Sequence, residues 1–355
     1  GAAPYFSFPT PFGISTDTPD TCTVEQIQLL SRHGERYPTV SKGKALTTLY
    51  EKFTNYTGEF SGNLSFLNDY TFFVDKSQLE RETTTNNTVL GNPYLGEINL
   101  MNHGRYFYTK YSDLLNNETL PVFTSNSKRV YDSAVNFARG FNSQHMLKNK
   151  NPIDYSVQII SENATTGANT LTPIKSCSKF DEDESEEYVK AFPKDYLKQA
   201  AERINDSNPV LNITTSDVQT MYVWCAFEIN VRGRSDMCDV LTTQELINFS
   251  YYDDLTEFYE HGPGNSLGKT VGSVLFNASL QLLTEENPSN KIWLSFTHDT
   301  DISNFLAAVG LFDTGKNMTN KHPEFQGHVF HKSWFVPQGA RVYTEKLSCN
   351  DTSYV

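Results

Sequence analysis

The chain has 355 residues, with 29 Lys and Arg against 42 Asp and Glu, and its formal net charge is -13. This length suits one large α/β domain or two domains, and 38% hydrophobic residues with 24 Phe and 19 Tyr exclude a disordered chain. The acidic balance argues against a general binder of nucleic acids or anionic membranes, because both need a basic surface. The longest apolar run, 305–312, has eight residues, whereas a membrane-spanning helix needs about 20, so we expect no membrane insertion.

Two features of the sequence indicate the compartment. Asn-x-Ser/Thr signals for N-glycosylation are nearly twice as frequent as chance predicts; they stand at Asn55, Asn63, Asn86, Asn117, Asn163, Asn205, Asn212, Asn248, Asn277, Asn317 and Asn350. The five cysteines contain no Cys-x-x-Cys pair, which favours disulfides over a zinc site. We therefore predict a secreted glycoprotein of the extracellular or cell-wall space, although an Asn- and Thr-rich surface also produces such signals by accident. The chain starts at Gly1 without Met, and we interpret it as a processed or truncated product.

Strands and helices are expected to alternate along the chain. Residues 1–20 are rich in Pro, Phe and Thr, and we expect an extended arm packed on a core. Apolar patterns predict strands at 24–31, 120–124, 155–160, 291–296 and 340–347. Helices are expected at 96–115, 130–141, 267–283 and 302–309, and a largely helical region at 181–260. This order is typical of a mostly parallel sheet that helices cover on both faces.

Three strongly polar clusters stand at the carboxyl ends of predicted strands. They are 32–36 (Arg-His-Gly-Glu-Arg), 127–129 (Ser-Lys-Arg) and 298–299 (His-Asp). That edge of an open α/β sheet is where ligands bind, because loops and helix N-termini converge there. Arg32, Arg36 and Arg129 would bring planar forks of N–H donors that suit the oxygens of a phosphate. In so acidic a protein, they indicate a small anionic group as ligand.

The two histidines and the aspartate of these clusters complete a phosphoryl-transfer site. His33 lies between two arginines, whose charges favour a neutral imidazole that can attack phosphorus. Asp299 can protonate a leaving alkoxide, and His298 can hydrogen-bond a phosphoryl oxygen. Because a free Asp has a pKa of about 3.9, acid catalysis by Asp299 predicts an acidic optimum unless burial raises that pKa.

Other kinds of site fit these residues less well. His298, Asp299 and Asp301 could instead bind a metal ion, but such a site usually needs more ligands at motif spacing. The remaining histidines are scattered, at His103, His145, His261, His322, His328 and His331. No complete Walker motif, Gly-x-x-x-x-Gly-Lys-Ser/Thr, occurs, which excludes that NTPase motif. Residues 264–268, Gly-Asn-Ser-Leu-Gly, match Gly-x-Ser-x-Gly, but they follow a largely helical region and no predicted strand, so they do not indicate a serine hydrolase.

Two segments carry a resemblance to a known family. Residues 31–38, Ser-Arg-His-Gly-Glu-Arg-Tyr-Pro, resemble the Arg-His-Gly-x-Arg-x-Pro signature of the histidine acid phosphatases, and 296–301, Phe-Thr-His-Asp-Thr-Asp, are similar to their distal His-Asp element. From the Ala-Pro-Tyr-Phe opening through 128–134 and 261–265 to Cys349, the chain resembles the fungal secreted acid phosphatase and phytase branch.

The resemblance implies a role for each site residue. His33 would be the nucleophile that forms a phosphohistidine, and Asp299 the proton donor to the leaving alcohol. The groups that bind the phosphoryl group would be Arg32, Arg36, Arg129 and His298. The family uses no metal or organic cofactor. Glu35 fills the variable position of the signature and is interpreted as a structural or rim residue, and Lys128 as a solvated surface lysine that could contact further phosphates.

The resemblance also implies the architecture. It is a phosphoglycerate-mutase-like α/β catalytic domain, assigned to residues 1–45, 116–180 and 266–355, with helical insertions 46–115 and 181–265 forming a smaller α domain. The implied disulfides are Cys22–Cys349 and Cys225–Cys238. Cys177 would be a half-bridge whose partner lies in a further C-terminal segment of the relatives; a free thiol or an intermolecular bridge is the alternative.

These observations predict a secreted acid phosphomonoesterase that hydrolyses organic phosphate esters, including phytate (myo-inositol hexakisphosphate), through a phosphohistidine. Its partner would be a small-molecule phosphate ester, and the resemblance suggests a homo-oligomer. The alternatives are a broad-specificity acid phosphatase with little phytase activity, a mutase-like phosphotransferase and a non-catalytic phosphate-binding protein. The glycosylation signals and cysteines favour the secreted hydrolase over the mutase.

Overall fold

One six-stranded sheet forms the centre of the computed structural model, which describes residues 2–6, 15–116, 119–166, 169–324, 329–350 and 352–355. The strand order is β3-β2-β4-β1-β5-β6. The strands are β1 (Cys22–Arg32), β2 (Leu120–Ser125), β3 (Tyr155–Ile160), β4 (Ile292–Thr297), β5 (Arg341–Cys349) and β6 (Thr352–Tyr354). The first four are mutually parallel, whereas at one edge β5 pairs antiparallel with β1 and β6 pairs antiparallel with β5. The predicted mostly parallel sheet is confirmed, with a short sixth strand that the apolar pattern did not indicate.

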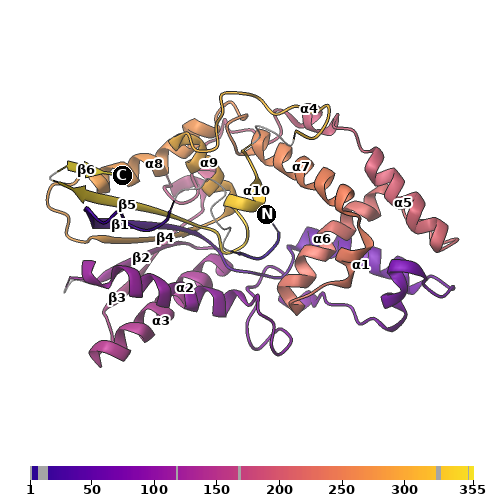
Figure 1. Ribbon diagram of the computed structural model, residues 1–355, viewed down its shortest axis with the longest axis horizontal. Coiled ribbons are helices and arrows are strands. Elements are labelled where there is room, and N and C mark those ends of the chain that lie inside the picture. Colours follow the sequence, from indigo (N-terminus) through magenta and orange to yellow (C-terminus); the bar gives the residue numbers. More distant parts are fainter. Residues whose placement is uncertain (1, 7–14, 117–118, 167–168, 325–328, 351) are drawn as a thin grey trace.

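Helices cover both faces of this sheet (Figure 1). Helices α2 (Gly96–Tyr111) and α3 (Lys128–Asn149) lie on one face, and α8 (Gly268–Thr284) and α9 (Asp299–Val309) on the other. Helices α2 and α3 cross closely at two glycines, because a Cβ on Gly104 would lie 2.1 Å from the carbonyl oxygen of Phe137 and one on Gly140 would lie 1.9 Å from that of Met101. This close crossing holds α3 so that its first turn lies at the carboxyl end of β2.

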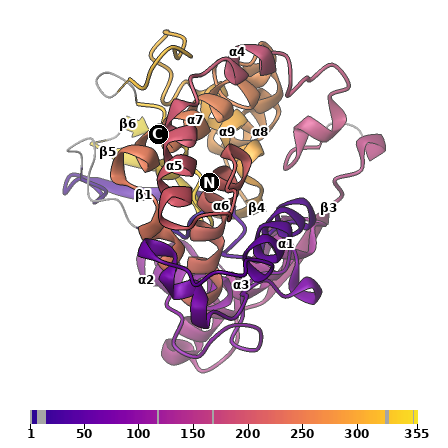
Figure 2. The ribbon, with the colours of Figure 1, turned by 90° about the vertical axis from the view of Figure 1, so that its right-hand side faces the viewer.

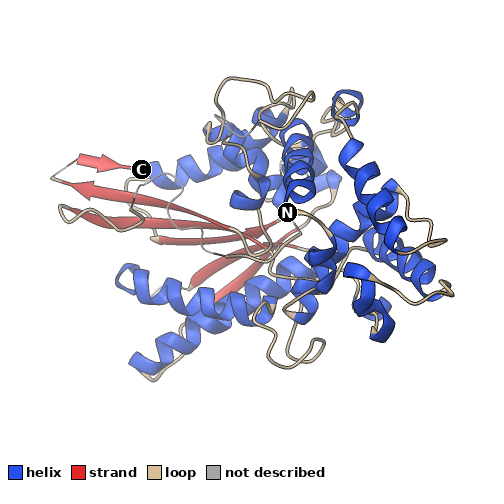
Figure 3. Ribbon diagram, turned by 45° about the vertical axis from the view of Figure 1, so that its right-hand side comes forward, coloured by secondary structure: helices blue, strands red, loops and turns tan. Residues whose placement is uncertain are grey.

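A second, helical part of the molecule lies beyond the carboxyl ends of the parallel strands (Figures 1 and 3). It contains α1 (Val40–Thr54), α4 (Glu186–Lys190), α5 (Asp195–Ser207), α6 (Thr215–Arg232) and α7 (Thr243–Glu260), and the short α10 (Lys332–Phe335) contacts α7. Both α6 and α7 begin with a capping box, Thr214 with Asp217 and Thr242 with Glu245, which satisfies N–H groups that the first helical turn leaves unpaired. Figure 2 views the molecule from this helical side.

Shorter helical turns connect these elements. They are the 3-10 segments η1 (Gly62–Asp69), η2 (Lys76–Gln78), η3 (Ser112–Leu114), η4 (Ala164–Thr166), η5 (Pro173–Ser176) and η6 (Asp236–Val240).

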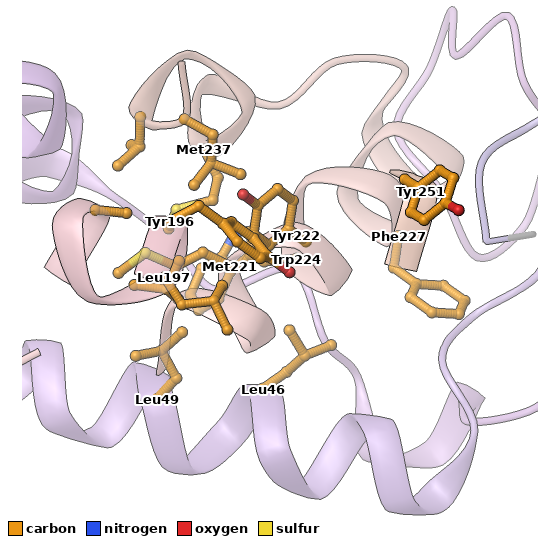
Figure 4. Packing of buried hydrophobic residues seen from close by; sticks show 14 of the residues in the cluster. Leu46, Leu49, Tyr196, Leu197, Met221, Tyr222, Trp224, Phe227, Met237 and Tyr251 are labelled. Atoms are coloured by element: carbon orange, nitrogen blue, oxygen red, sulfur yellow. The ribbon is translucent and has the colours of Figure 1, made fainter. Parts of the chain in front are cut away.

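Trp224 is the centre of the helical part (Figure 4). Its indole is fully buried and packs against the rings of Phe53, Phe72 and Phe73, with centroid distances of 5.9, 5.1 and 5.7 Å. Its Nε1–H donates to Glu228 Oε2 at 3.0 Å, so burying the indole leaves no polar atom unpaired. This aromatic packing therefore joins α1, α6 and the intervening segments in one hydrophobic core.

Helix α2 departs from the predicted division of the chain. It lies within 46–115, which was assigned to the helical insertions, but its Phe107 and Tyr111 share a buried cluster with Ile27 of β1 and Phe296 of β4. The cause is the close contact with α3, which the spacing of apolar residues within α2 alone does not reveal. The other boundaries of the division stay predictions.

Two disulfides link separate elements of the structure. Cys22 and Cys349 are register partners on β1 and β5 and are bonded, as are Cys225 of α6 and Cys238 of η6. Both are the pairs that the family resemblance implies. Cys177 has no disulfide partner among the described residues, and the missing partner in a further segment stays a prediction.

The surface positions of the glycosylation signals agree with accessible sites. Asn205 and Asn248 are half-buried, and Asn117 lies outside the described residues. The other eight asparagines are exposed, and they are Asn55, Asn63, Asn86, Asn163, Asn212, Asn277, Asn317 and Asn350. Among the described residues, no helix has the length and apolar character needed to cross a membrane.

Candidate active site

The three polar clusters meet at one edge of the sheet. Strands β1 and β4 are parallel neighbours with Arg32 opposite Thr297, and β2 pairs with β4 up to Thr124. His33 follows β1, His298 follows β4, and Arg129 lies in the first turn of α3 just after β2. The imidazole rings of His33 and His298 are 5.9 Å apart, so segments distant in sequence form one site.

His33 is buried, and one of its ring nitrogens forms a hydrogen bond with the backbone. Its side chain is 1% exposed, and Nδ1 lies 2.9 Å from the carbonyl oxygen of Gly34. A carbonyl can only accept, so Nδ1 carries the proton and Nε2 keeps its lone pair. Burial, together with the positive charges of Arg32, Arg36 and Arg129, lowers the pKa of His33 well below its usual range. The imidazole is therefore neutral and nucleophilic even in acid.

Arg32 and Asp299 form an ion pair at the base of the site. Arg32 Nη2 lies 2.8 Å from Asp299 Oδ2, and the guanidinium, which is 2% exposed, also donates to the carbonyl of Val336. Burial alone would raise the pKa of Asp299, but the charges of Arg32 and Lys332 lower it well below its usual range. The pKa of Asp299 is therefore not raised, although burial alone would raise it.

The other two arginines offer donors to a ligand. Arg36 donates to the carbonyl of Tyr37 at 2.8 Å and lies over the ring of Phe227, 5.4 Å from its centroid. Burial and the nearby charges of Arg129 and Arg32 lower the pKa of Arg36 to about 9. Among the described residues, the Nε–H groups of Arg36 and Arg129 have no hydrogen-bond partner. Arg32 and Arg36 are buried and Arg129 is half-buried. These three crowded cations form a cradle for a dianion, because the anion relieves both their repulsion and their desolvation.

His298 is held between two charged groups. Its Nδ1 lies 3.4 Å from Arg129 Nη2, and its Nε2 lies 2.7 Å from Glu162 Oε1. Glu162 stands two residues after β3 and was not among the residues predicted from the sequence. The available signal was its position, because β3 is parallel to β2 and ends at the same edge of the sheet.

Buried hydrogen bonds fix the loop that carries His33. The N–H of Gly34 donates to Ser133 Oγ at 2.9 Å, and the Ser133 hydroxyl donates to Glu82 at 2.7 Å. Burial raises the pKa of Glu82 to about 8, against the hydrogen bonds from Ser133 and Asn136. Glu35 is fully buried and accepts from the N–H of Tyr5 at 3.0 Å, so it is a structural residue away from the rim.

Two residues near the motifs pair with groups outside the three arginines. Lys128 is 67% exposed and pairs with Asp132 at 2.8 Å, as expected for a surface lysine. Asp301 is buried with Oδ2 3.3 Å from the hydroxyl of Thr297, and burial raises its pKa to about 8. Within the described ranges, which leave out His328, no three His, Cys, Asp or Glu side chains are grouped as metal ligands.

A cavity of about 430 Å³ opens from Arg32, Arg36 and Asp299 toward the helical part. Its far wall carries Lys42 of α1 and a set of apolar and aromatic side chains from α6 and α7, which are Tyr222, Val223, Ala226, Phe227, Leu246 and Phe249. Lys332, also in the lining, forms ion pairs with Glu257 at 2.9 Å and Asp253 at 3.3 Å. Burial opposes the charge of Lys332, but these carboxylates and Asp299 raise its pKa. Lys332 was not predicted from the sequence, because no motif surrounds it.

The comparisons with known proteins agree with this geometry. Acid phosphatase PHO11 of Saccharomyces cerevisiae is 48% identical over 360 residues, covering 100% of this chain and 75% of that protein. Phytase PHO112 of Candida albicans is 47% identical over 357 residues, covering 100% and 76%. The crystal structure of the phytase from D. castellii matches with a TM-score of 0.94 and 45% identity, covering 100% and 76%.

A more distant structure shares the fold. The inositol polyphosphate phosphatase of Bifidobacterium longum, solved with inositol hexasulfate, matches with a TM-score of 0.66 at 13% identity over 98% of this chain and 87% of that one. The sequence profile of the histidine phosphatase superfamily (branch 2) matches residues 23–355. With the motif histidines at the carboxyl ends of β1 and β4, the chain belongs to branch 2 of the histidine phosphatase superfamily.

Proposed function

We propose that this protein is an acid phosphomonoesterase that hydrolyses organic phosphate esters through a phosphohistidine on His33. The observation that carries the proposal is the neutral, buried imidazole of His33 with its Nε2 lone pair among Arg32, Arg36 and Arg129. These guanidinium groups and His298 would bind the oxygens of the phosphoryl group.

In the first step, His33 Nε2 attacks phosphorus and the bond from phosphorus to the ester oxygen breaks. The leaving oxygen takes a proton from the carboxyl group of Asp299, so the alcohol departs neutral. Because the pKa of Asp299 is low in the free protein, this step needs acid. A bound phosphate dianion also neutralises Arg32, which weakens the ion pair and raises the pKa of Asp299 in the complex.

In the second step, water attacks the phosphohistidine. The carboxylate of Asp299 takes one proton from the water, the oxygen bonds to phosphorus, and the phosphorus–nitrogen bond breaks. Inorganic phosphate leaves, His33 regains its lone pair, and Asp299 is again protonated for the next cycle.

Phytate is proposed as one substrate, supported by the similarity to the phytases of Candida albicans and D. castellii. The second candidate is an acid phosphatase with little phytase activity. The cavity favours this candidate in one respect, because its far wall is largely apolar and carries Lys42 as an exposed cation. A substrate with many phosphates gains most from cationic walls.

Secretion and glycosylation belong to the same proposal. They are supported by the two disulfides and by the exposed Asn-x-Ser/Thr signals.

Turnover of phytate and of simple monoesters, compared from about pH 2 to 7, tests the activity and its acid dependence. Release of inorganic phosphate at acid pH with trapping of a phosphoprotein is the expected result. Tight binding of phosphate esters without release would instead show a binding protein, and transfer to an added alcohol in preference to water would show a phosphotransferase.

A further inference from the structure

We propose that Glu162 is a positioning residue for phosphoryl transfer: its carboxylate accepts the Nε2–H of His298 and so directs Nδ1 of that ring into the phosphate cradle. The inference rests on the proposed function, in which His298 contacts a phosphoryl oxygen. Glu162 acts only through His298 and does not itself reach the substrate.

The position of Glu162 is fixed by its neighbours. It stands just after β3, which pairs with β2 in parallel register up to Ser125 and Ile160 (Figure 1). Its backbone N–H donates to Asn126 Oδ1 at 2.9 Å, and the hydroxyl of Ser125 bonds its carboxylate. The loops after β2 and β3 therefore hold one carboxylate at the sheet edge.

The ring of His298 has one orientation that satisfies both nitrogens. Nε2 lies 2.7 Å from Glu162 Oε1, while Nδ1 lies 3.4 Å from Arg129 Nη2, and the side chain is 11% exposed. A ring turned by 180° would lose the contact with Glu162. A carboxylate can only accept, so it keeps the Nε2 proton in place and leaves Nδ1 facing Arg129.

Glu162 stays ionised in acid, where the enzyme is proposed to work. Burial alone would raise its pKa, but the hydrogen bonds from His298 and Ser125 and the charges of His298 and Arg129 lower the pKa of Glu162 to about 2. A charged acceptor holds the Nε2–H of His298 more strongly than a neutral one does. A neutral amide at position 162 would keep an acceptor but lose this support.

The charged groups that face His298 come from several elements. Arg129 belongs to α3, His33 follows β1 and Asp299 belongs to α9, while Lys175, Glu182 and Asp301 share the hollow with Glu162. Glu162 has the direct contact with Nε2. Its removal therefore changes the hydrogen bond and the local charge at the same atom.

The test compares Glu162→Gln and Glu162→Ala with the unchanged chain. We expect kcat to fall about 10–100-fold for Glu162→Ala and less for Glu162→Gln, with a smaller change in KM. Glu182→Gln is the control, because it removes the same charge from the same hollow but faces His261 instead of His298.

A double-mutant cycle separates positioning from a general structural role. In a His298→Ala background, Glu162→Ala should cost no further activity, because its effect passes through that ring. A second loss of the same size would overturn the proposal.

A measurement that does not depend on turnover tests the role of Glu162 separately from the proposed function. In protein labelled with ¹⁵N-histidine, the ring nitrogens of His298 should report Nε2–H in the unchanged chain and a mixture of tautomers in Glu162→Ala. The same tautomer mixture in both proteins would refute the positioning role even if the enzyme hydrolyses phosphate esters. A tautomer change in a chain that hydrolyses none would refute the proposed function alone.

Discussion

The two walls of the cavity are built in different ways. The sheet wall presents Arg32, Arg36 and Asp299 from segments directly attached to β1 and β4, and buried hydrogen bonds fix them. The opposite wall presents Lys42 and aromatic side chains from the surfaces of α1, α6 and α7. The chemistry is therefore encoded in short motifs at strand ends, whereas the contacts of the leaving group depend on how separate helices pack.

Of the variants that separate the two walls, His33→Ala, on the side of the sheet, should have the largest effect on kcat. Without the nucleophile, kcat should fall on the order of 10⁴-fold or more, and no phosphoprotein should be trapped by acid quenching. His322→Ala, on the exposed surface, serves as the control and should retain full activity. Undiminished turnover in His33→Ala would falsify the covalent mechanism.

Asp299→Asn should have the next largest effect, and its size should depend on the substrate. Alkyl phosphates have poor leaving groups and should lose about 10²–10⁴-fold in kcat, while p-nitrophenyl phosphate should lose much less, since its leaving group needs no proton. Equal losses on both substrates would remove Asp299 from the role of general acid.

The pH profile follows from two lowered pKa values. His33 must be neutral to attack, and its low pKa keeps it so in acid; Asp299 must be protonated, and its low pKa means that the protonated fraction falls as pH rises. We expect kcat on alkyl phosphates to decline toward neutral pH in the unchanged chain. In the Asp299→Asn variant that decline should flatten, which stopped-flow or steady-state rates across the acid range can measure.

The sequence predicts the residues of the sheet wall better than those of the helical wall. The polar clusters at 32–36, 127–129 and 298–299 could be placed together because carboxyl ends of parallel strands share an edge. Glu162 lies at the same edge but has no motif around it. Lys332 could not be found, because its place depends on the docking of α10 against α7. Nor could the pattern of β5 reveal its antiparallel direction, which its pairing with β1 decides.

Substitutions in the core of the helical part should lower the free energy of unfolding and leave the catalytic groups unchanged. Trp224→Ala removes the centre of its aromatic core and leaves a large cavity, so the free energy of unfolding should fall by about 3–5 kcal/mol. Urea unfolding measures this loss. Trp334→Ala, at a side chain that is 36% exposed, should cost much less, and equal losses would show that Trp224 is not the centre of packing.

The smallest effect should come from Lys42→Gln on the helical wall, and only with highly charged substrates. An exposed lysine gains little from one phosphate, so kcat/KM for phytate should fall about 2–5-fold while that for p-nitrophenyl phosphate stays unchanged. Lys44→Gln is the matched control, because it removes the same charge from an exposed position of α1 outside the cavity lining. Equal falls for both variants would assign the effect to long-range attraction by the whole helix. A fall confined to Lys42→Gln would instead mean that this wall contacts the further phosphates of the substrate.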